Sequence, residues 1–239
     1  MPQTPRLQFI DIHCHLLPGI DDGSRDWDMT EVMLRQAWDN GITKIIATSH
    51  ADPARREFPL LKYTETLDKA NALSRQKELG VELLPGCEIM YAEGITERLL
   101  GEQRIPCLAG TRHVLVEFYP DVRYDTILAA LIHLANAGYA AILAHIERYE
   151  CLYKRYDRIA ELRAADAKLQ VNCNTIIKPA GFFAKRYIDR LLSDNLIDCL
   201  ATDAHSSDVR RINMKEAYDV IIKSYKDGER LFQAEGLKL

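Results

Sequence analysis

Short runs of aliphatic residues recur along the chain, and longer segments with helical periodicity separate them. Seven of the runs have the length and composition of buried strands. They span residues 7–13, 43–49, 81–87, 113–118, 140–144, 169–173 and 197–201. Strands that alternate with helices are typical of a parallel sheet covered by helices. The pattern therefore predicts an α/β fold.

The helices expected between these strands have recognisable ends. The first is predicted to begin at the capping-box spacing of Asp28 and Glu31 and to end near Gly41. The others span residues 64–79, 125–137, 156–167 and 184–193, followed by a helical tail at 213–231. About seven strand–helix units result, one fewer than in the regular eight-stranded barrel. We therefore expect a barrel of seven units.

The composition indicates an ordinary globular protein. With 239 residues, 47% of them hydrophobic, the chain can bury a large core, and we expect one domain over residues 1–239. Residues 1–8 would form an N-terminal extension, and residues 213–239 a C-terminal helix and tail. A net charge of −4 argues against a nucleic-acid partner.

The same sequence bears on localisation and on thiol chemistry. The first eight residues lack the apolar core of a secretory signal, and no later run is long enough to cross a bilayer. We expect a cytoplasmic protein without direct membrane insertion. The six cysteines form no CxxC pair, so reduced and buried thiols are favoured over disulfides.

Histidines and carboxylates stand at the ends of nearly all the predicted strands. Residues two apart in a strand share a face, so His13 and His15 can chelate one ion while Cys14 turns away. Asp203 and His205 repeat this spacing. The candidate metal ligands are His13, His15, Asp22, His50, Glu88, Glu117, His145, Asp203 and His205.

The joint placement of these residues carries more weight than any one of them. A lone histidine at a strand end is more often a structural residue, as we expect for His113 and His133. Five of the seven histidines, however, share the carboxyl-terminal ends of strands. Nine ligands suit two or three ions, and imidazole with carboxylate but without thiolate favours manganese, iron or zinc. Clustered divalent ions activate water, so hydrolysis is the expected reaction.

Two other phosphatase signatures fail on this chain. None of the six cysteines is followed six positions later by the arginine of a cysteine-dependent phosphatase. The segment from Asp26 to Thr30 matches a D-x-D-x-T string, but no buried strand precedes it. Helix capping is the better interpretation of Asp26.

Six motifs along the chain resemble one superfamily. In order they are DIHCHLLPGIDDG, ATSH, PGCEI, LVEF, AHIERY and ATDAH. Over residues 9–211 they resemble the polymerase-and-histidinol-phosphatase (PHP) superfamily. They are most similar to the manganese-dependent protein-tyrosine phosphatases of bacterial capsule and exopolysaccharide loci, the CpsB/YwqE type. The resemblance implies a distorted (β/α)7 TIM-like barrel.

The resemblance also distributes the candidate ligands over two or three divalent ions, manganese foremost, with iron, cobalt or zinc as alternatives. It implies His13, His15, Glu88 and Asp203 for the first ion, Glu88, Glu117 and His145 for the second, and Asp22, His50 and His205 for the third.

Arg148 and Arg210 would be the catalytic phosphate-clamping arginines, with Arg211 as a substitute for Arg210. A surface ion pair of Arg148 with Glu147 or Glu150 is the alternative for that residue. The implied mechanism is attack of a metal-bridging hydroxide on phosphorus. The implied substrate is the phosphorylated tyrosine-rich tail of a bacterial tyrosine kinase that regulates polysaccharide synthesis.

Two alternatives remain open from the sequence. The same ligands would serve a phosphatase of a small metabolite such as histidinol phosphate, or a non-catalytic metal-binding PHP module. The loop at 52–61 is expected at the barrel mouth, where Arg55 and Arg56 would contact an acidic peptide. An oligomer is possible.

Overall fold

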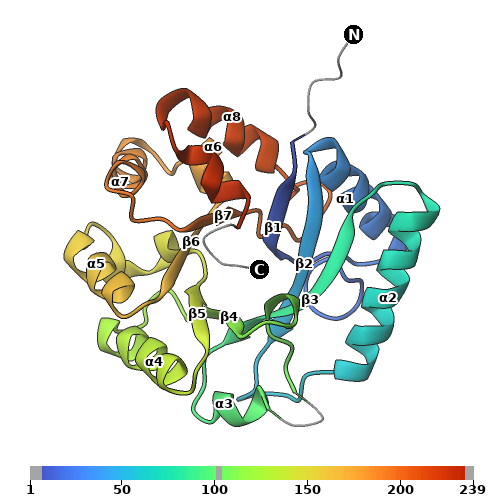
Figure 1. Ribbon diagram of the computed structural model, residues 1–239, viewed down its shortest axis with the longest axis horizontal. Helices are drawn as coiled ribbons and strands as arrows, with labels where there is room; N and C mark the ends of the chain where they lie inside the picture. Colours follow the sequence, from blue (N-terminus) through green and yellow to red (C-terminus); the bar gives the residue numbers. More distant parts are fainter. Residues whose placement is uncertain (1–6, 101–103, 235–239) are drawn as a thin grey trace.

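The computed structural model describes residues 7–100 and 104–234. Seven parallel strands follow one another around the sheet in sequence order. Beyond the last strand, Ala204 forms a parallel bridge with Cys14 of the first strand and nearly closes the barrel (Figure 1). The predicted seven-unit barrel is confirmed. The strands are β1 (Phe9–Cys14), β2 (Ile42–Ala51), β3 (Glu82–Met90), β4 (His113–Glu117), β5 (Ala140–Leu143), β6 (Lys168–Asn172) and β7 (Cys199–Ala201).

Helices surround the barrel on its outside (Figure 1). The α-helices are α1 (Trp27–Asp39), α2 (Leu60–Gln76), α3 (Ile95–Arg98), α4 (Tyr124–Asn136), α5 (Tyr156–Ala164), α6 (Cys173–Ile177), α7 (Phe182–Ser193) and α8 (Met214–Ser224). Four 3₁₀ turns are η1 (Leu108–Gly110), η2 (Ile146–Arg148), η3 (Glu150–Leu152) and η4 (Gly228–Phe232). The sequence did not predict α3, α6 or the 3₁₀ turns, because segments this short carry no periodicity.

The start of α1 corrects one prediction and supports another. Asp26 adopts an extended backbone, and its carboxylate accepts a hydrogen bond from the Met29 backbone nitrogen at 2.8 Å. Helix α1 therefore begins at Trp27, and the predicted capping box at Asp28 and Glu31 is wrong. Asp26 is the cap because a short carboxylate satisfies a backbone donor of the first turn.

Strands β2 and β3 run further than predicted, and this extension positions functional residues. They pair in unbroken register from Lys44 opposite Glu82 to Ala51 opposite Ile89. His50 therefore lies directly opposite Glu88. Helix α2 also begins earlier than expected, at Leu60, so the rim loop after β2 ends at Pro59.

Apolar side chains from the strands fill the barrel interior. The buried residues of this inner cluster are Ile12, Ile46, Leu108, Leu115, Ile142, Ala144, Cys199, Ala201 and Ala234. A larger apolar cluster lies between the strands and the surrounding helices. Strand β6 differs from its neighbours, because Gln170 is fully buried and polar. A buried amide must be hydrogen-bonded, so Gln170 indicates a polar network above the apolar layer.

The helical tail predicted at 213–231 is confirmed in part. Helix α8 ends at Ser224, and Tyr225 is extended before the turn η4 begins. Gly228 approaches α8 so closely that a Cβ at this position would lie 2.1 Å from Ile221 Cγ2, so only glycine fits there. The Phe232 ring at the end of η4 packs with its centroid 5.4 Å from that of Phe9.

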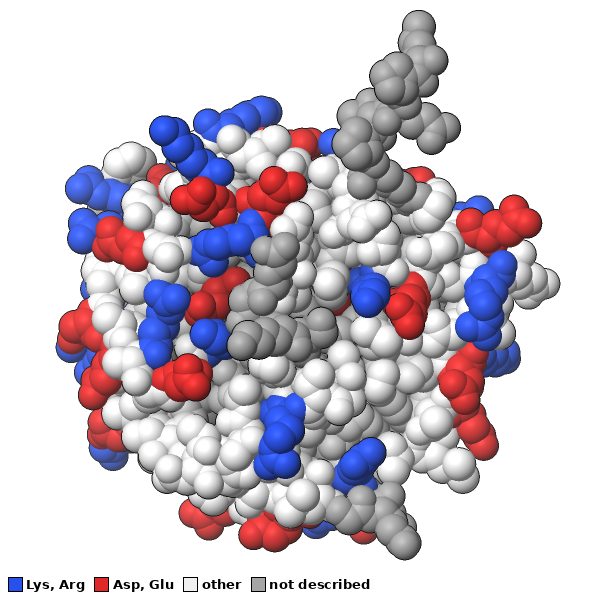
Figure 2. Space-filling view, viewed as in Figure 1, with Lys and Arg blue, Asp and Glu red and all other residues white. Residues whose placement is uncertain are grey.

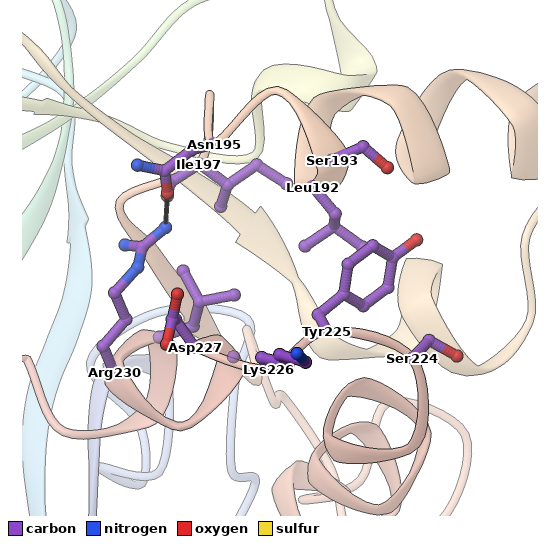
Figure 3. Close-up of a pocket in the computed structure, with 11 residues that line it drawn as sticks. Leu192, Ser193, Asn195, Ile197, Ser224, Tyr225, Lys226, Asp227 and Arg230 are labelled. Carbon is purple, nitrogen blue, oxygen red and sulfur yellow. Dashed lines mark hydrogen bonds between the residues drawn. The ribbon is translucent and has the colours of Figure 1, made fainter.

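A pocket of about 580 Å³ lies where this break occurs. Figure 3 shows it between the ends of α7 and α8 and the turn η4, with Arg230 hydrogen-bonded to Asn195 across one side. Asn195 and Ile197 precede β7, so the pocket lies at the amino-terminal end of this strand. None of its lining residues is a predicted ligand.

Basic and acidic side chains are interspersed on the face shown in Figure 2, without an extended area of one sign. Within residues 7–100 and 104–234, no helix has the length and apolar character needed to span a membrane. All six cysteines are free. Four are buried, whereas Cys107 and Cys151 are half-buried, so the prediction of buried thiols holds for four of the six.

Candidate metal centre

The nine predicted ligands lie together at the carboxyl-terminal ends of the strands. Three groups of donor atoms are close enough to hold an ion, each with all its atoms within 4.8 Å of one another. The groups are His13, His15, Glu88 and Asp203; His50, Glu88 and Glu117; and His15, Asp22, His50 and His205. The ninth residue, His145, contacts Glu88 of the first two groups.

The end of β1 supplies two fully buried imidazoles. The Nε2 atoms of His13 and His15 are 3.1 Å apart, and Cys14 between them packs in the outer apolar cluster. His13 Nε2 lies 3.0 Å from a Glu88 oxygen and 3.4 Å from Asp203 Oδ1. The alternation expected from the sequence therefore aims both rings at one point.

Glu88 occupies the middle of the cluster. Its Oε2 lies 3.2 Å from both His15 Nε2 and His50 Nδ1, and its Oε1 lies 2.8 Å from His145 Nε2. The two oxygens of one carboxylate thus face different sets of imidazoles. This arrangement suits a ligand that bridges two ions.

His50 also joins two groups of donors. Its Nδ1 lies 3.0 Å from Glu117 Oε1, while its Nε2 lies 3.4 Å from Asp22 Oδ1. The sequence assigned His50 only to the group of Asp22 and His205. The structure also brings it to Glu88 and Glu117, because the strand pairing sets β2 directly beside β3.

The donor set fits divalent ions. Five imidazoles and four carboxylates converge without a thiolate, which suits manganese, iron, cobalt or zinc. The buried Nε2 of His205 forms no hydrogen bond and lies 3.5 Å from Asp22 Oδ1. A buried nitrogen without a hydrogen-bond partner, next to a carboxylate oxygen, is the pattern of a coordination site.

The electrostatics of the cluster lead to the same conclusion. Burial disfavours the charged Glu88, but the charge of His13 and hydrogen bonds from His13, His145 and His15 together outweigh burial and hold the pKa of this carboxyl well below its ordinary value. Burial also opposes protonation of His15, yet the carboxylates of Asp21 and Glu88 raise its pKa to about 10. Burial likewise opposes protonation of His145, but the carboxylates of Glu117 and Glu88 raise its pKa to about 9. Protonated imidazoles here balance the carboxylates, a role that metal cations would take with neutral imidazole ligands.

Asp21, which the sequence analysis did not single out, supports two ligands. Its Oδ2 accepts hydrogen bonds from His15 Nδ1 and from the His50 backbone nitrogen, both at 2.9 Å. Burial disfavours its charge, but the hydrogen bond and charge of His15, with the backbone hydrogen bonds from His50 and Gly23, together outweigh burial and lower the pKa of Asp21. The adjacent pair of aspartates at 21–22 was the available signal, since a ligating histidine needs a partner for its other nitrogen.

Strand β6 carries a second support. Gln170 Oε1 accepts from the His145 backbone nitrogen at 2.8 Å and lies 3.2 Å from His13 Nδ1. Its amide donates to Asn172 Oδ1, and the Asn172 amide donates to Asp203 Oδ2, both at 2.8 Å. Two amides alternating in an otherwise apolar strand were the sequence signal.

The two predicted arginines meet on one carboxylate. Arg148 and Arg210 contact Asp203 at 2.5 and 2.9 Å, one on each oxygen, and both remain partly exposed. Arg211 instead pairs with Glu216 at 2.6 Å. Glu147, the alternative partner of Arg148, is half-buried and accepts a hydrogen bond from the Asn172 backbone nitrogen.

Different clefts border the cluster on two sides. The arginine flank is a cleft of about 300 Å³ lined by Arg148, Asn172, Asn174, Thr175, Thr202, Asp203, Val209, Arg210, Arg211 and Asn213. The aromatic flank is a cleft of about 430 Å³ lined by His50, Ala51, Asp52, Arg55, Arg56, Met90, Glu117 and Tyr119. The first belongs to β5–β7 and the second to β2–β4.

Residues 9–234 match the family model described as capsular polysaccharide synthesis, CpsB/CapC. The chain belongs to the CpsB/CapC family. It is 30% identical over 230 residues to the tyrosine-protein phosphatase CpsB of Streptococcus pneumoniae, covering 93% of this chain and 94% of that protein. It is 32% identical over 219 residues to the tyrosine-protein phosphatase YwqE of Bacillus subtilis, covering 90% and 85%.

Solved structures agree with this assignment. A crystal structure from work on YwqE and CpsB, described as metal-dependent tyrosine phosphatases, matches with a TM-score of 0.83 and 29% identity over 92% of this chain and 89% of that one. A histidinol phosphate phosphatase of Lactococcus lactis matches with a TM-score of 0.58 at 14% identity, which shows a shared fold. The predicted membership among the metal-dependent tyrosine phosphatases of the CpsB/YwqE type is confirmed.

Proposed function

We propose that this CpsB/CapC protein hydrolyses phosphotyrosine on the tyrosine-rich tail of a bacterial tyrosine kinase that regulates capsular or exopolysaccharide synthesis. The observation that carries the proposal is the meeting of Arg148 and Arg210 on Asp203, at the edge of a nine-residue ligand cluster. The named relatives are tyrosine-protein phosphatases, which supports the same reaction.

The ligand cluster would hold two or three divalent ions, with manganese as the proposed metal. The proposed ligands are His13, His15, Asp22, His50, Glu88, Glu117, His145, Asp203 and His205. When bound, the ions would lower the pKa of water to supply a hydroxide nucleophile and would offset negative charge on the phosphoryl group. Asp21 and Gln170 keep ligand side chains in place before substrate arrives.

Arg148 and Arg210 orient the phosphoryl group. Their guanidinium groups already lie side by side on Asp203, so an incoming phosphoryl group can share both. Planar guanidinium groups donate paired hydrogen bonds to phosphate oxygens, a geometry that lysine does not match. The arginines therefore bind the non-bridging oxygens and hold phosphorus over the cluster.

The leaving group makes only a modest demand on the protein. Free tyrosine has a pKa of about 10, so its phenolate departs without a strong protein acid. The departing phenolate therefore needs only the cationic side chains and hydrogen-bond donors that line the two flanks near the cluster.

The test is hydrolysis of a phosphotyrosine peptide by metal-stripped protein after addition of manganese, iron, cobalt or zinc. Metal-dependent turnover, lost in both His145→Ala and Arg148→Ala, is the expected result. Faster turnover of histidinol phosphate than of the peptide would replace the proposal with a metabolite phosphatase. Metal-loaded protein without activity on any phosphomonoester would point to a metal-binding module.

A further inference from the structure

The aromatic flank opens directly onto the ligand cluster. Its lining includes the ligands His50 and Glu117 together with Met90 and Tyr119. Met90 lies two residues after Glu88 in β3 and so shares the face of the strand that carries this ligand. A group seated in this cleft would therefore lie against the metal centre.

One aromatic ring stands at the mouth of the cleft in a braced position. The Tyr119 side chain is 51% exposed, although it lies only two residues beyond the ligand Glu117. Arg55 donates a hydrogen bond to the Tyr119 hydroxyl at 2.6 Å, and its guanidinium lies 5.9 Å from the ring centroid. Arg55 is itself held by Asp52 at 3.3 Å. The loop after β2 thus fixes an exposed ring that packs little against the core.

The order of the strands sets the two flanks on opposite sides of the barrel mouth. Arg148 follows β5 and Arg210 follows β7, whereas the aromatic flank comes from β2, β3 and β4. When the arginines bind the non-bridging oxygens of the phosphoryl group, the ester oxygen and the organic group attached to it point away from the arginines. The organic group then points toward Met90 and Tyr119.

From this arrangement, and resting on the proposed function, we infer that the aromatic flank binds the phenyl ring of phosphotyrosine. Tyr119 and Met90 form its walls, and Arg55 keeps the Tyr119 ring in place. The cleft of about 430 Å³ is large enough for a phenyl ring and open enough for the peptide that carries it. Offset or edge-to-face contact with Tyr119 favours an aryl group over an alkyl group of equal charge. Tyr119 is thus a specificity residue that does not touch phosphorus.

Binding of two phosphonates, which the enzyme cannot hydrolyse, separates ring recognition from phosphate recognition. Benzylphosphonate has the shape of phenyl phosphate, and methylphosphonate lacks the ring. Titration calorimetry on manganese-loaded protein would give both affinities. In Tyr119→Ala we expect benzylphosphonate to bind about tenfold more weakly and methylphosphonate to change by less than about twofold. Tyr119→Phe should retain the preference for benzylphosphonate, because the ring remains.

Tyr153→Ala is a matched control, since Tyr153 is an exposed tyrosine that follows η3, packs against Tyr187 and lines neither cleft. It should leave both affinities unchanged. Equal weakening of both phosphonates by Tyr119→Ala, or no weakening of benzylphosphonate, would overturn the inference. Either result would leave the proposed function standing if wild-type protein still hydrolyses the phosphotyrosine peptide. Wild-type protein that acts on alkyl phosphates but not on that peptide would instead contradict the proposed function.

Discussion

The two flanks of the ligand cluster differ in chemistry although both are built from loops at the same end of the barrel. On the arginine flank, two guanidinium groups converge on one buried carboxylate. On the aromatic flank, Met90 and a half-exposed Tyr119 border the ligands, and Arg55 braces the Tyr119 ring. One side offers paired guanidinium donors that converge on a carboxylate, and the other offers Met90 and Tyr119 next to the rim arginines Arg55 and Arg56.

This difference suits a substrate with two unlike ends. A phosphate monoester presents charged oxygens on one side of phosphorus and an organic group on the other. The asymmetry therefore assigns charge recognition to β5–β7 and recognition of the organic group to β2–β4.

The largest expected effect comes from disrupting the centre that both flanks share. Glu88→Gln keeps the shape of the side chain but removes the charge that faces His13, His15, His50 and His145. We expect bound manganese to fall, and phosphotyrosine hydrolysis to drop by at least about a thousandfold. Metal analysis of the purified variant and steady-state kinetics check both.

Glu82→Gln, an exposed position at the start of the same strand, is the control for Glu88→Gln and should behave as wild type. A Glu88→Gln protein with full metal content and near-normal rate would show that Glu88 does not bridge the ions.

Removing one guanidinium group of the arginine flank should lower the rate of phosphotyrosine hydrolysis nearly as much as Glu88→Gln does. Arg148→Ala deletes a donor aimed at the phosphoryl position, and loss of such a donor typically lowers kcat by about 100- to 1000-fold. Metal content should stay unchanged. Arg211→Ala, next to Arg210 but paired with Glu216, should change kcat by less than about twofold. Comparable losses in Arg148→Ala and Arg211→Ala would contradict the assignment of phosphate binding to Arg148 and Arg210 rather than Arg211.

A smaller effect is expected from the support beneath the ligands. Asp21→Asn keeps the size of the side chain but replaces the charged acceptor of His15 Nδ1. Loss of such a partner typically weakens metal binding by about 10- to 100-fold. Competition for manganese against a chelator of known affinity measures this change. Asp28→Asn, on the exposed side of α1, is the control and should bind manganese as wild type does. An unchanged manganese affinity in Asp21→Asn would mean that this aspartate only shapes the loop.

The smallest effect concerns the basic residues of the rim loop. In the Arg55→Ala/Arg56→Ala double variant, we expect KM for an acidic phosphotyrosine peptide to rise by about three- to tenfold, with kcat within about twofold. The increase should shrink in about 1 M salt, since exposed charges are screened. A KM unchanged at low salt would remove these arginines from peptide recognition.

Much of the centre could be predicted from the chain alone. Parallel strands all end at the same rim, so residues as distant in sequence as His13 and His205 were expected to meet once the strands were located. Alternation within a strand further placed His13 and His15 on one face, with Cys14 in the outer core. The barrel and the nine candidate ligands therefore follow from local pattern, whereas Arg148 was implied by the resemblance of the AHIERY motif.

Other features depend on contacts between segments far apart in the chain, and only the tertiary structure decided them. Asp21 contacts His15 while Asp22 reaches His50 and His205, a division that two neighbouring aspartates do not reveal. Arg210 meets Asp203, whereas its neighbour Arg211 pairs with Glu216, and the spacing alone does not distinguish the two.

The aromatic flank and the break in the C-terminal helix also depend on contacts between segments far apart in the chain. Tyr119 meets Arg55 because β2 and β4 stand on either side of β3. The tail needs glycine at Gly228 because Ile221 leaves no room there for a side chain. Periodicity and spacing report which face of an element a residue occupies. Which partner fills that face depends on how the elements pack against one another.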